Sequence, residues 1–409
     1  MKILHTADWH LGKKLEHFSR LEEQREVLDE ICQIADDENV DAVLIAGDLF
    51  DVANPSIDSI ELFYKTLKRL AKHGQRAVIG IAGNHDSPDR IEAPDPLARE
   101  CGIILLGYPN STIRPFSLDN GIAITRSDEG FVEVKLPNQE TLLRVILTPY
   151  ANENRLKKYL GDANQEQALR ELLQDKWKNT ANTYFDENGV NILMTHLFVT
   201  PSGDIDEDLE DEEEKSVLSL GGAQAIHTQN FPSSCQYVAL GHIHSYYAVQ
   251  EDPFPIVYSS SPLCYSVSDR QKEKHVVLVD IEAGKQARYQ KIPLTKGKKT
   301  AQVKCQGMEE ALSYLQDNPN KLIELTLVTD HHLTASERKQ LFDSHQGILR
   351  IIPEFSDPEL LKFTSGKQID LSKDMMDIFS DFFMYRKNQE INEELKSLFK
   401  EIINEKVEE

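Results

Sequence analysis

The sequence of 409 residues predicts an α/β sandwich with helices outside, followed by a small α+β domain and C-terminal helices. In residues 1–268, short apolar runs alternate with amphipathic segments, which is typical of parallel strands joined by helical crossovers. Five of these runs are followed within two residues by Asp, Asn or His. Because carboxyl ends of parallel strands meet at one edge of a sheet, we expect a ligand site there.

The segment 40–51, V-D-A-V-L-I-A-G-D-L-F-D, shows this pattern most clearly. Its unbroken apolar run is typical of a strand that is buried on both faces. Gly47 then allows a tight backbone turn and places Asp48 at the carboxyl end of the strand. Further strands are expected at residues 2–7, 77–82, 190–194, 237–240 and 256–259.

Helices are expected where apolar side chains recur on one face, at residues 20–38, 57–72 and 165–178. Ser56 is a suitable N-cap for the second of these helices. The apolar side chains of that helix allow two interpretations, a homodimer interface or packing into the protein's own core. They are Ile60, Leu62, Phe63 and Leu67.

The pattern changes near Asp269. A strand at 275–281, a helix at 309–315 and a strand at 322–328 indicate a small α+β domain over residues 269–365. Residues 366–409 are expected to be helical, with Phe and Met crowding one face. Such a face either folds back onto this chain as a hairpin or docks on a partner, and we favour the partner.

The formal net charge of −23 opposes a nucleic-acid partner, which normally needs a basic surface. Two features weaken this objection: acidic residues concentrate in a loop at 204–214, and bound cations would add local positive charge. The five scattered cysteines form no C-x-x-C pair, and no segment is apolar over the ~20 residues that span a bilayer. With no signal peptide expected, these features indicate a reducing cytoplasm.

Seven candidate metal ligands follow the apolar runs. They are Asp8, His10, Asp48, Asn84, His196, His242 and His244. Oxygen and imidazole ligands without thiolates suit manganese, iron or zinc. Seven ligands are too many for one tetrahedral ion but suit two ions sharing a carboxylate, and Asp48 is the expected bridge. Two ions about 3.5–4 Å apart can clamp the attacking and leaving oxygens of an in-line phosphoryl displacement.

His85 follows a candidate ligand directly but is not needed as one, so we expect it to be catalytic. It would serve as general acid or stabilise the departing oxygen in the transition state. Asp51 is expected to orient and polarise that imidazole. Lone histidines such as His5, His17 and His227 are expected to be structural.

D-x-H, G-D-x-x-D, G-N-H-D, a later His and G-H-x-H together resemble the five motifs of calcineurin-like metallophosphoesterases. Within that superfamily the chain is most similar to the bacterial repair nucleases that work with an SMC-like ATPase. The local similarity is close in H-T-A-D-W-H-L-G, A-G-D-L-F-D, A-G-N-H-D-S, L-S-L-G-G-A-Q-A-I and A-L-G-H-I-H. It covers the first ~270 residues firmly and the remainder more loosely.

The resemblance implies a two-sheet metallophosphoesterase sandwich with two manganese ions; Mg²⁺, Fe²⁺ or Zn²⁺ are alternatives. It implies one ion held by Asp8, His10, Asp48 and His244, and another held by Asp48, Asn84, His196 and His242. It further implies a 3′-to-5′ exonuclease on double-stranded DNA ends that also cuts hairpins and single-stranded DNA. His85 would be the catalytic residue.

The resemblance also implies partners. The domain at 269–365 would cap the active site and touch DNA, and residues 366–409 would dock on the ATPase. ATP would act only through that partner, and two copies of this chain would form a homodimer within a heterotetramer. A nucleoid-associated location without membrane contact follows. Lys13, Lys14 and Arg90 are candidate phosphate contacts.

Two features depart from the family. Asp51 stands where archaeal relatives have a second catalytic histidine, so the proton relay differs. The acidic loop at 204–214 is an addition that would repel DNA near His196.

Three other functions are weighed against the nuclease. Protein phosphatases continue G-D-x-x-D with Arg-Gly, whereas Val52 and Ala53 follow here, which disfavours such a phosphomonoesterase. A cyclic-nucleotide phosphodiesterase would leave the C-terminal segments without a role. A purely tethering subunit is disfavoured by the complete ligand set.

Overall fold

The computed structural model describes residues 1–160, 165–201, 226–267, 269, 273–355, 375–387, 391 and 395–399. The chain divides into two compact units, of which the first comprises residues 1–302 and 320–324. The second comprises residues 303–319 and 325–409. None of the helices in the described ranges is long and apolar enough to cross a bilayer.

The first unit contains a six-stranded sheet in the order β17-β16-β1-β4-β5-β6. Its strands are β1 (Lys2–Thr6), β4 (Ala42–Ala46), β5 (Ala77–Ile81), β6 (Ile103–Leu106), β16 (Lys274–Asp280) and β17 (Arg288–Leu294). Neighbours from β1 to β6 are parallel, so the carboxyl ends of β1, β4 and β5 share one edge. β16 and β17 extend the sheet in antiparallel fashion.

A seven-stranded sheet has the order β14-β15-β13-β10-β9-β8-β7. Its strands are β7 (Ala123–Asp128), β8 (Phe131–Lys135), β9 (Leu143–Thr148), β10 (Val190–His196), β13 (Tyr237–Gly241), β14 (Tyr247–Gln250) and β15 (Ile256–Tyr258). β9, β10, β13 and β15 are parallel to one another, which directs the ends of β10 and β13 to one edge as well.

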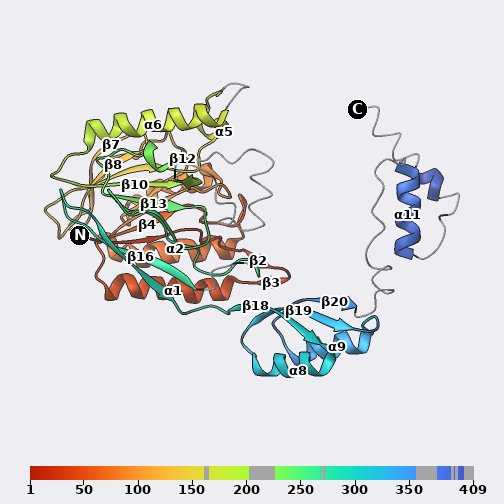
Figure 1. Ribbon diagram of the computed structural model, residues 1–409. Coiled ribbons are helices and arrows are strands. Elements are labelled where there is room, and N and C mark those ends of the chain that lie inside the picture. Colours follow the sequence, from red (N-terminus) through yellow and green to blue (C-terminus); the bar gives the residue numbers. More distant parts are fainter. Residues whose placement is uncertain are drawn as a thin grey trace. The chain divides into compact units, whose positions relative to one another are not determined.

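The two sheets pack face to face, with helices on both outer faces (Figure 1). α1 (Leu21–Asp37) and α2 (Ile57–Leu70) cover the six-stranded sheet, and α6 (Gln165–Tyr184) covers the seven-stranded sheet. Because side chains alternate along a strand, Ile3 faces the other sheet while Leu4 faces the helices. Apolar residues are therefore needed at every position, which confirms the predicted two-sided burial.

The predicted helices 20–38 and 57–72 are confirmed within two residues, whereas the helix predicted to end at 178 continues to Tyr184. The Ser56 hydroxyl caps α2 by accepting from the Ser59 N–H at 3.2 Å. Leu62, Phe63 and Leu67 are buried in the core between α2 and the sheet. Of the two interpretations of this helix, packing into its own core is correct for these three side chains.

The structure corrects the place of residues 274–294, which the sequence pattern assigned to the small domain. They form β16 and β17 of the first sheet, where β16 pairs with β1 from Lys2↔Asp280 to His5↔Val277. The physical reason is that β1 has a free edge that a returning strand can complete. An apolar run with strand periodicity does not indicate which sheet it joins.

The second unit has the element order β18-α8-β19-α9-β20. The strands β18 (Thr300–Gln306), β19 (Leu322–Thr329) and β20 (Ile348–Phe355) form one sheet. Its helices α8 (Gly307–Asp317) and α9 (Ala335–Ser344) lie between them in sequence, and α11 (Met375–Lys387) follows. Phe379 of α11 stacks on Phe399 with ring centroids 3.9 Å apart. The acidic loop at 204–214 lies outside the described residues.

Short elements complete the described chain. They are β2 (Lys14–Leu15), β3 (Phe18–Ser19), η1 (Lys72–Gly74), α3 (Pro88–Glu92), α4 (Asp95–Arg99), α5 (Glu153–Leu156), β11 (Val199–Thr200), β12 (Ile226–His227) and η3 (Thr228–Asn230).

Candidate metal centre

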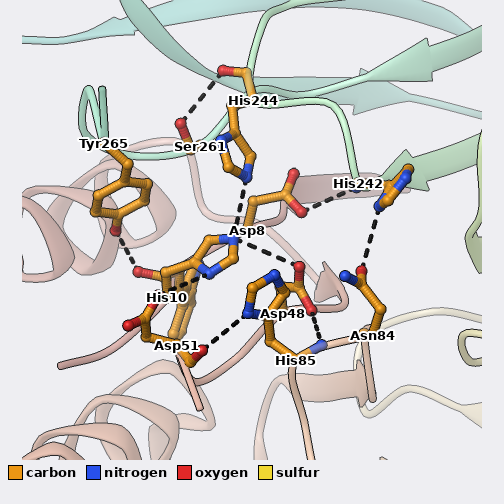
Figure 2. Close-up of polar contacts among 12 residues, drawn as sticks. Asp8, His10, Asp48, Asp51, Asn84, His85, His242, His244, Ser261 and Tyr265 are labelled. Atoms are coloured by element: carbon orange, nitrogen blue, oxygen red, sulfur yellow. Dashed lines mark hydrogen bonds and ion pairs between the residues drawn. The ribbon is translucent and has the colours of Figure 1, made fainter. Parts of the chain in front are cut away.

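The loops that follow β1, β4, β5, β10 and β13 converge at the shared edge of the two sheets. Figure 2 shows the candidate ligands that it labels, from the loops after β1, β4, β5 and β13, pointing toward one another. The loop after β1 runs beside the loop after β4, because the Asp8 N–H donates to Gly47 O at 3.0 Å and the His10 N–H donates to Asp48 O at 2.9 Å. The strand ends converge as predicted, but the expectation of a single sheet is corrected, because β1, β4 and β5 belong to one sheet and β10 and β13 to the other.

Four of these residues have left-handed backbones, which side-chain-bearing residues rarely adopt. The φ angles are 55° for Asp8, 43° for His10, 47° for Asp48 and 106° for His242. Each such residue costs of order 1–3 kcal/mol and is retained only where the surroundings enforce it. Such strain is typical of functional sites.

Glycines in the motifs allow the loops to approach closely. A Cβ on Gly47 would lie 2.2 Å from His196 Nδ1, and one on Gly83 would lie 2.0 Å from Asp48 Oδ1. A Cβ on Gly241 would lie 1.8 Å from Ala46 O. In the G-D, G-N and G-H pairs, a candidate metal ligand therefore directly follows a position where only glycine fits.

Asp8, His10 and His244 form one group of potential ligands. The Nε2 atoms of His10 and His244 lie 3.0 Å apart. Asp8 Oδ1 accepts a hydrogen bond of 2.9 Å from the His242 N–H, which links this group to the loop after β13. All three side chains are buried.

The second group is built around Asn84 and His196. His196 Nε2 lies 2.9 Å from Asn84 Oδ1 and 3.3 Å from Asp48 Oδ2, and His242 Nδ1 lies 3.2 Å from Asn84 Oδ1. Asp48 Oδ2 also lies 3.4 Å from His10 Nε2. Asp48 thus stands between the two groups, as a bridging ligand must.

His85 is half-buried beside Asp48, and its backbone N–H donates to Asp48 Oδ1 at 3.0 Å. Its ring Nδ1 lies 2.9 Å from the backbone carbonyl oxygen of Asp51. The expectation that the Asp51 carboxylate orients this ring is therefore corrected, since the main chain makes the contact. That carboxylate instead lies 3.6 Å from His10 Nδ1 and 3.4 Å from Lys13 Nζ.

Asp86 was not predicted to have a role, although it belongs to the G-N-H-D motif. Its two carboxylate oxygens accept from the N–H groups of Gly83, Leu49 and Phe50 at 2.8–3.0 Å. It therefore joins the loop after β5 to the loop after β4. Burial, reinforced by the Asp48 carboxylate, raises the pKa of Asp86 to about 7.

Gln24 and Tyr265 were also missed, because neither belongs to a motif. Gln24 Nε2 lies 2.7 Å from His10 O and 3.3 Å from Trp9 O, while its Oε1 accepts from the Gly12 N–H at 3.0 Å. The Tyr265 hydroxyl donates to Trp9 O. Both side chains satisfy backbone groups of the D-x-H loop.

The protonation of the imidazoles follows from burial and from neighbouring charge. Burial lowers the pKa of His10 to about 3 and that of His242 to about 3, so both are neutral at pH 7, the form that binds metals. Burial opposes the charged form of His196, but the Asp48 and Asp8 carboxylates outweigh it and raise its pKa to about 9. Burial raises the pKa of Asp8 to about 6.

The donor set fits divalent cations. Among the described residues, Asp8 Oδ2, His10 Nδ1 and Asp48 Oδ2 are buried polar atoms without a hydrogen-bond partner. An unsatisfied buried polar atom costs about 1–3 kcal/mol, so two such carboxylate oxygens at one place require explanation. A cation bound to oxygen and imidazole ligands would satisfy them.

The remaining predicted residues lie outside these two groups. Lys14 and Arg90 are exposed, and Lys13 is near Asp51. His5 is buried, with its ring nitrogens 2.9 Å from the Tyr237 hydroxyl and 3.1 Å from Leu240 O, as expected for a structural histidine.

Comparison with known proteins identifies the family. The model of the calcineurin-like phosphoesterases matches residues 1–246. The SbcD component of the nuclease SbcCD from Bacillus subtilis (strain 168) is 35% identical over 363 residues, covering 87% of this chain and 86% of the relative. A protein of the same description from Rhodobacter capsulatus is 30% identical over 296 residues, covering 72% and 69%.

Among solved structures, a dimetal phosphatase from Danio rerio aligns with 72% of this chain and 99% of its own, with a TM-score of 0.38 and 11% identity. A similarity of this size carries no argument about function. The family match and the observed sheets confirm the predicted sandwich. The chain therefore belongs to the calcineurin-like phosphoesterases and, within them, to the SbcD family of SbcCD nuclease components.

Proposed function

We propose that this chain is the nuclease subunit of an SbcCD-type DNA repair complex and hydrolyses DNA phosphodiesters with two divalent ions, manganese being the preferred metal. Family membership supports hydrolytic phosphoesterase chemistry. The observation that carries the proposal is the position of Asp48 Oδ2, which lies 3.4 Å from His10 Nε2 and 3.3 Å from His196 Nε2. Two bound ions would supply a hydroxide nucleophile and stabilise charge on the reacting phosphate.

We assign one ion to Asp8, His10, Asp48 and His244, and the other to Asp48, Asn84, His196 and His242. The short distance between His10 Nε2 and His244 Nε2 supports the first assignment. The contacts of Asn84 Oδ1 with His196 and His242 support the second.

His85 is the proposed catalytic residue. A carbonyl oxygen can only accept, so the contact with Asp51 O requires a proton on His85 Nδ1. This leaves Nε2 to face the substrate. A second proton, on Nε2, lets the ring donate a hydrogen bond to the leaving oxygen and then protonate it.

The first test is degradation of an end-labelled linear duplex in Mn²⁺ by the wild-type protein, His85→Ala and His17→Ala. We expect His85→Ala to lose about 10²–10⁴-fold in rate, the usual contribution of general acid–base catalysis. Metal analysis should find two ions in every protein, because His85 is not a proposed ligand. His17 is exposed, so its variant is the matched control and should cleave normally.

Hydrolysis of a phosphomonoester by a protein that leaves DNA intact would refute the nuclease assignment. The 3′-to-5′ polarity and the cleavage of hairpins and single strands are read from the product ladders in the same experiment.

We also propose that residues 366–409 dock on the SMC-like ATPase SbcC and that ATP acts through that partner. Exposed Met375 and Leu398 support an apolar docking face. Deletion of residues 370–409 should abolish binding of the ATPase and leave manganese-dependent cleavage intact. Normal binding by the truncated chain would contradict the assignment.

Homodimerisation and DNA contact by the small α+β unit remain predictions from the family resemblance. Sedimentation of the purified chain over a range of concentrations tests the first of these predictions.

A further inference from the structure

Arg155 contacts the loop that contains the G-N-H-D motif, from a distant part of the chain. It lies in α5, in the connection that follows β9. Its Nη1 donates to Gly83 O at 2.6 Å, and its Nη2 donates to Asn84 O at 3.1 Å and to Asp86 O at 2.8 Å. One guanidinium therefore binds three carbonyl oxygens of a four-residue loop.

The arginine is itself held in place. The Asn152 side chain caps α5 by accepting from the Arg155 N–H at 2.9 Å. The guanidinium carbon lies 5.1 Å from the centre of the Tyr150 ring, within the range of a cation–π contact. The Tyr150 N–H donates to Ala82 O at 2.9 Å, which joins the same two loops a second time.

A guanidinium is suited to this task because its donors are fixed in one plane and cannot lose their charge at neutral pH. The loop has no regular secondary structure, so its carbonyl groups need partners from elsewhere. A lysine ammonium is a compact charge, and it cannot reproduce the planar fork that spans these oxygens.

The loop bears two groups that the proposed reaction needs. Asn84 Oδ1 faces His196 and His242, and the His85 backbone N–H donates to Asp48. Asp86 fixes the loop from the side of β4 through the Leu49 and Phe50 N–H groups. Arg155 fixes it from the side of β9, through the carbonyl groups.

We propose that Arg155 is a positioning residue that orients Asn84 for metal binding and His85 for catalysis. The inference rests on the proposed function, because it assigns an ion to Asn84, His196 and His242. Arg155 acts through the loop carbonyl groups and does not itself touch the substrate. Loss of the guanidinium therefore weakens the binding of one metal ion and lowers kcat, with little effect on KM.

The test compares Arg155→Ala and Arg155→Lys with Arg170→Ala. Arg170 is a matched control, because its guanidinium pairs with Glu166 within α6 at 3.0 Å. Binding of Mn²⁺ is measured by calorimetry and electron paramagnetic resonance. We expect one of two ions to bind at least about tenfold more weakly in both Arg155 variants, as for other residues that orient metal ligands.

Guanidinium ion added at millimolar concentration should restore both the affinity for the more weakly bound Mn²⁺ and kcat in Arg155→Ala. It should not do so in Arg155→Lys, whose side chain occupies the space. A purely structural role would lower thermal stability without a selective loss of one ion and without rescue. Arg155→Lys also keeps the proposal testable if Arg155→Ala does not fold.

Unchanged Mn²⁺ affinities in both variants would overturn the proposal. A raised KM with unchanged kcat and metal binding would also overturn it and identify Arg155 as a phosphate contact. Failure of the nuclease assignment is distinguishable, because the wild-type protein would then bind two Mn²⁺ ions and still leave DNA intact. The selective loss of one ion remains measurable in that case.

Discussion

The two halves of the metal centre are held in different ways. The half with Asp8 and His10 is buried, and neutral donors from Gln24 and Tyr265 satisfy its backbone. In the other half, His196 and His242 are buried while Asn84 and His85 are half-buried, and the ionisable side chains of Arg155 and Asp86 hold the loop.

The ligand loops of one metal centre can therefore be held by two kinds of interaction. Neutral hydrogen bonds in a buried loop depend on close packing and are insensitive to salt. Hydrogen bonds made by charged groups are stronger individually, but near solvent they are weakened by added ions, which screen the charge. Substitutions in the two halves should therefore differ in salt dependence and in rescue.

The largest effect is expected where the halves meet. Asp48→Asn removes the charge shared by His10 and His196, so both ions should be lost and phosphodiester hydrolysis should fall by about 1,000-fold or more. Metal analysis and cleavage assays check this outcome. Retention of one ion at wild-type affinity would show that the halves are independent.

A smaller effect is expected from Gly83→Ala, which would place a Cβ 2.0 Å from Asp48 Oδ1. The loop must move, and a displacement of about 1 Å can cost about 100-fold in rate. Gly80→Ala is the control, since its Cβ would lie 3.1 Å from Leu105 Cδ2, the nearest atom. Equal rates for the two variants would contradict the argument from close approach.

Gln24→Met tests the neutral half. The variant keeps the shape of the side chain but leaves His10 O and the Gly12 N–H without this partner, so unfolding should become easier by about 1–3 kcal/mol. Chemical denaturation measures this change, which should not depend on salt. Gln33→Met on the same helix, where Gln33 contacts Asp37 at an exposed position, should change stability little. A strong salt dependence would abolish the distinction between the halves.

The smallest effect is expected for an ion pair outside the metal centre, in which one partner is exposed to solvent. Glu133 accepts from Arg126 at 2.8 Å and from Arg144 at 2.9 Å. Burial opposes ionisation, but these two arginines hold the pKa of Glu133 below its ordinary value. Arg126 is 52% exposed, so Arg126→Ala should lower the free energy of unfolding by only about 1 kcal/mol or less.

The sign of the pH dependence follows from the lowered pKa. The contribution of Glu133 is present above its unfolded pKa and is lost as the pH falls through the folded value. The difference between Arg126→Ala and the wild-type protein should therefore shrink in acid. A difference that grows in acid would contradict this account.

The sequence alone determined the strands, their apolar character and the motifs at their ends. Loops that follow parallel strands of one sheet end at the same edge, which groups the loops after β1, β4 and β5, and separately those after β10 and β13. The packing of the two sheets brings these two groups of loops together. The glycines before Asp48, Asn84 and His242 belong to the same local pattern, and the structure explains each by a close approach. This much is local periodicity, which a single sequence displays.

Only the tertiary structure decided how these loops are supported. Arg155 is 71 residues from Asn84 in sequence, and Tyr265 is 256 residues from Trp9. The carbonyl of Asp51, and not its carboxylate, meets His85, because the path of the main chain sets that contact. The pairing of β16 with β1 is also tertiary, because it depends on β1 lying at a sheet edge that β16 can complete.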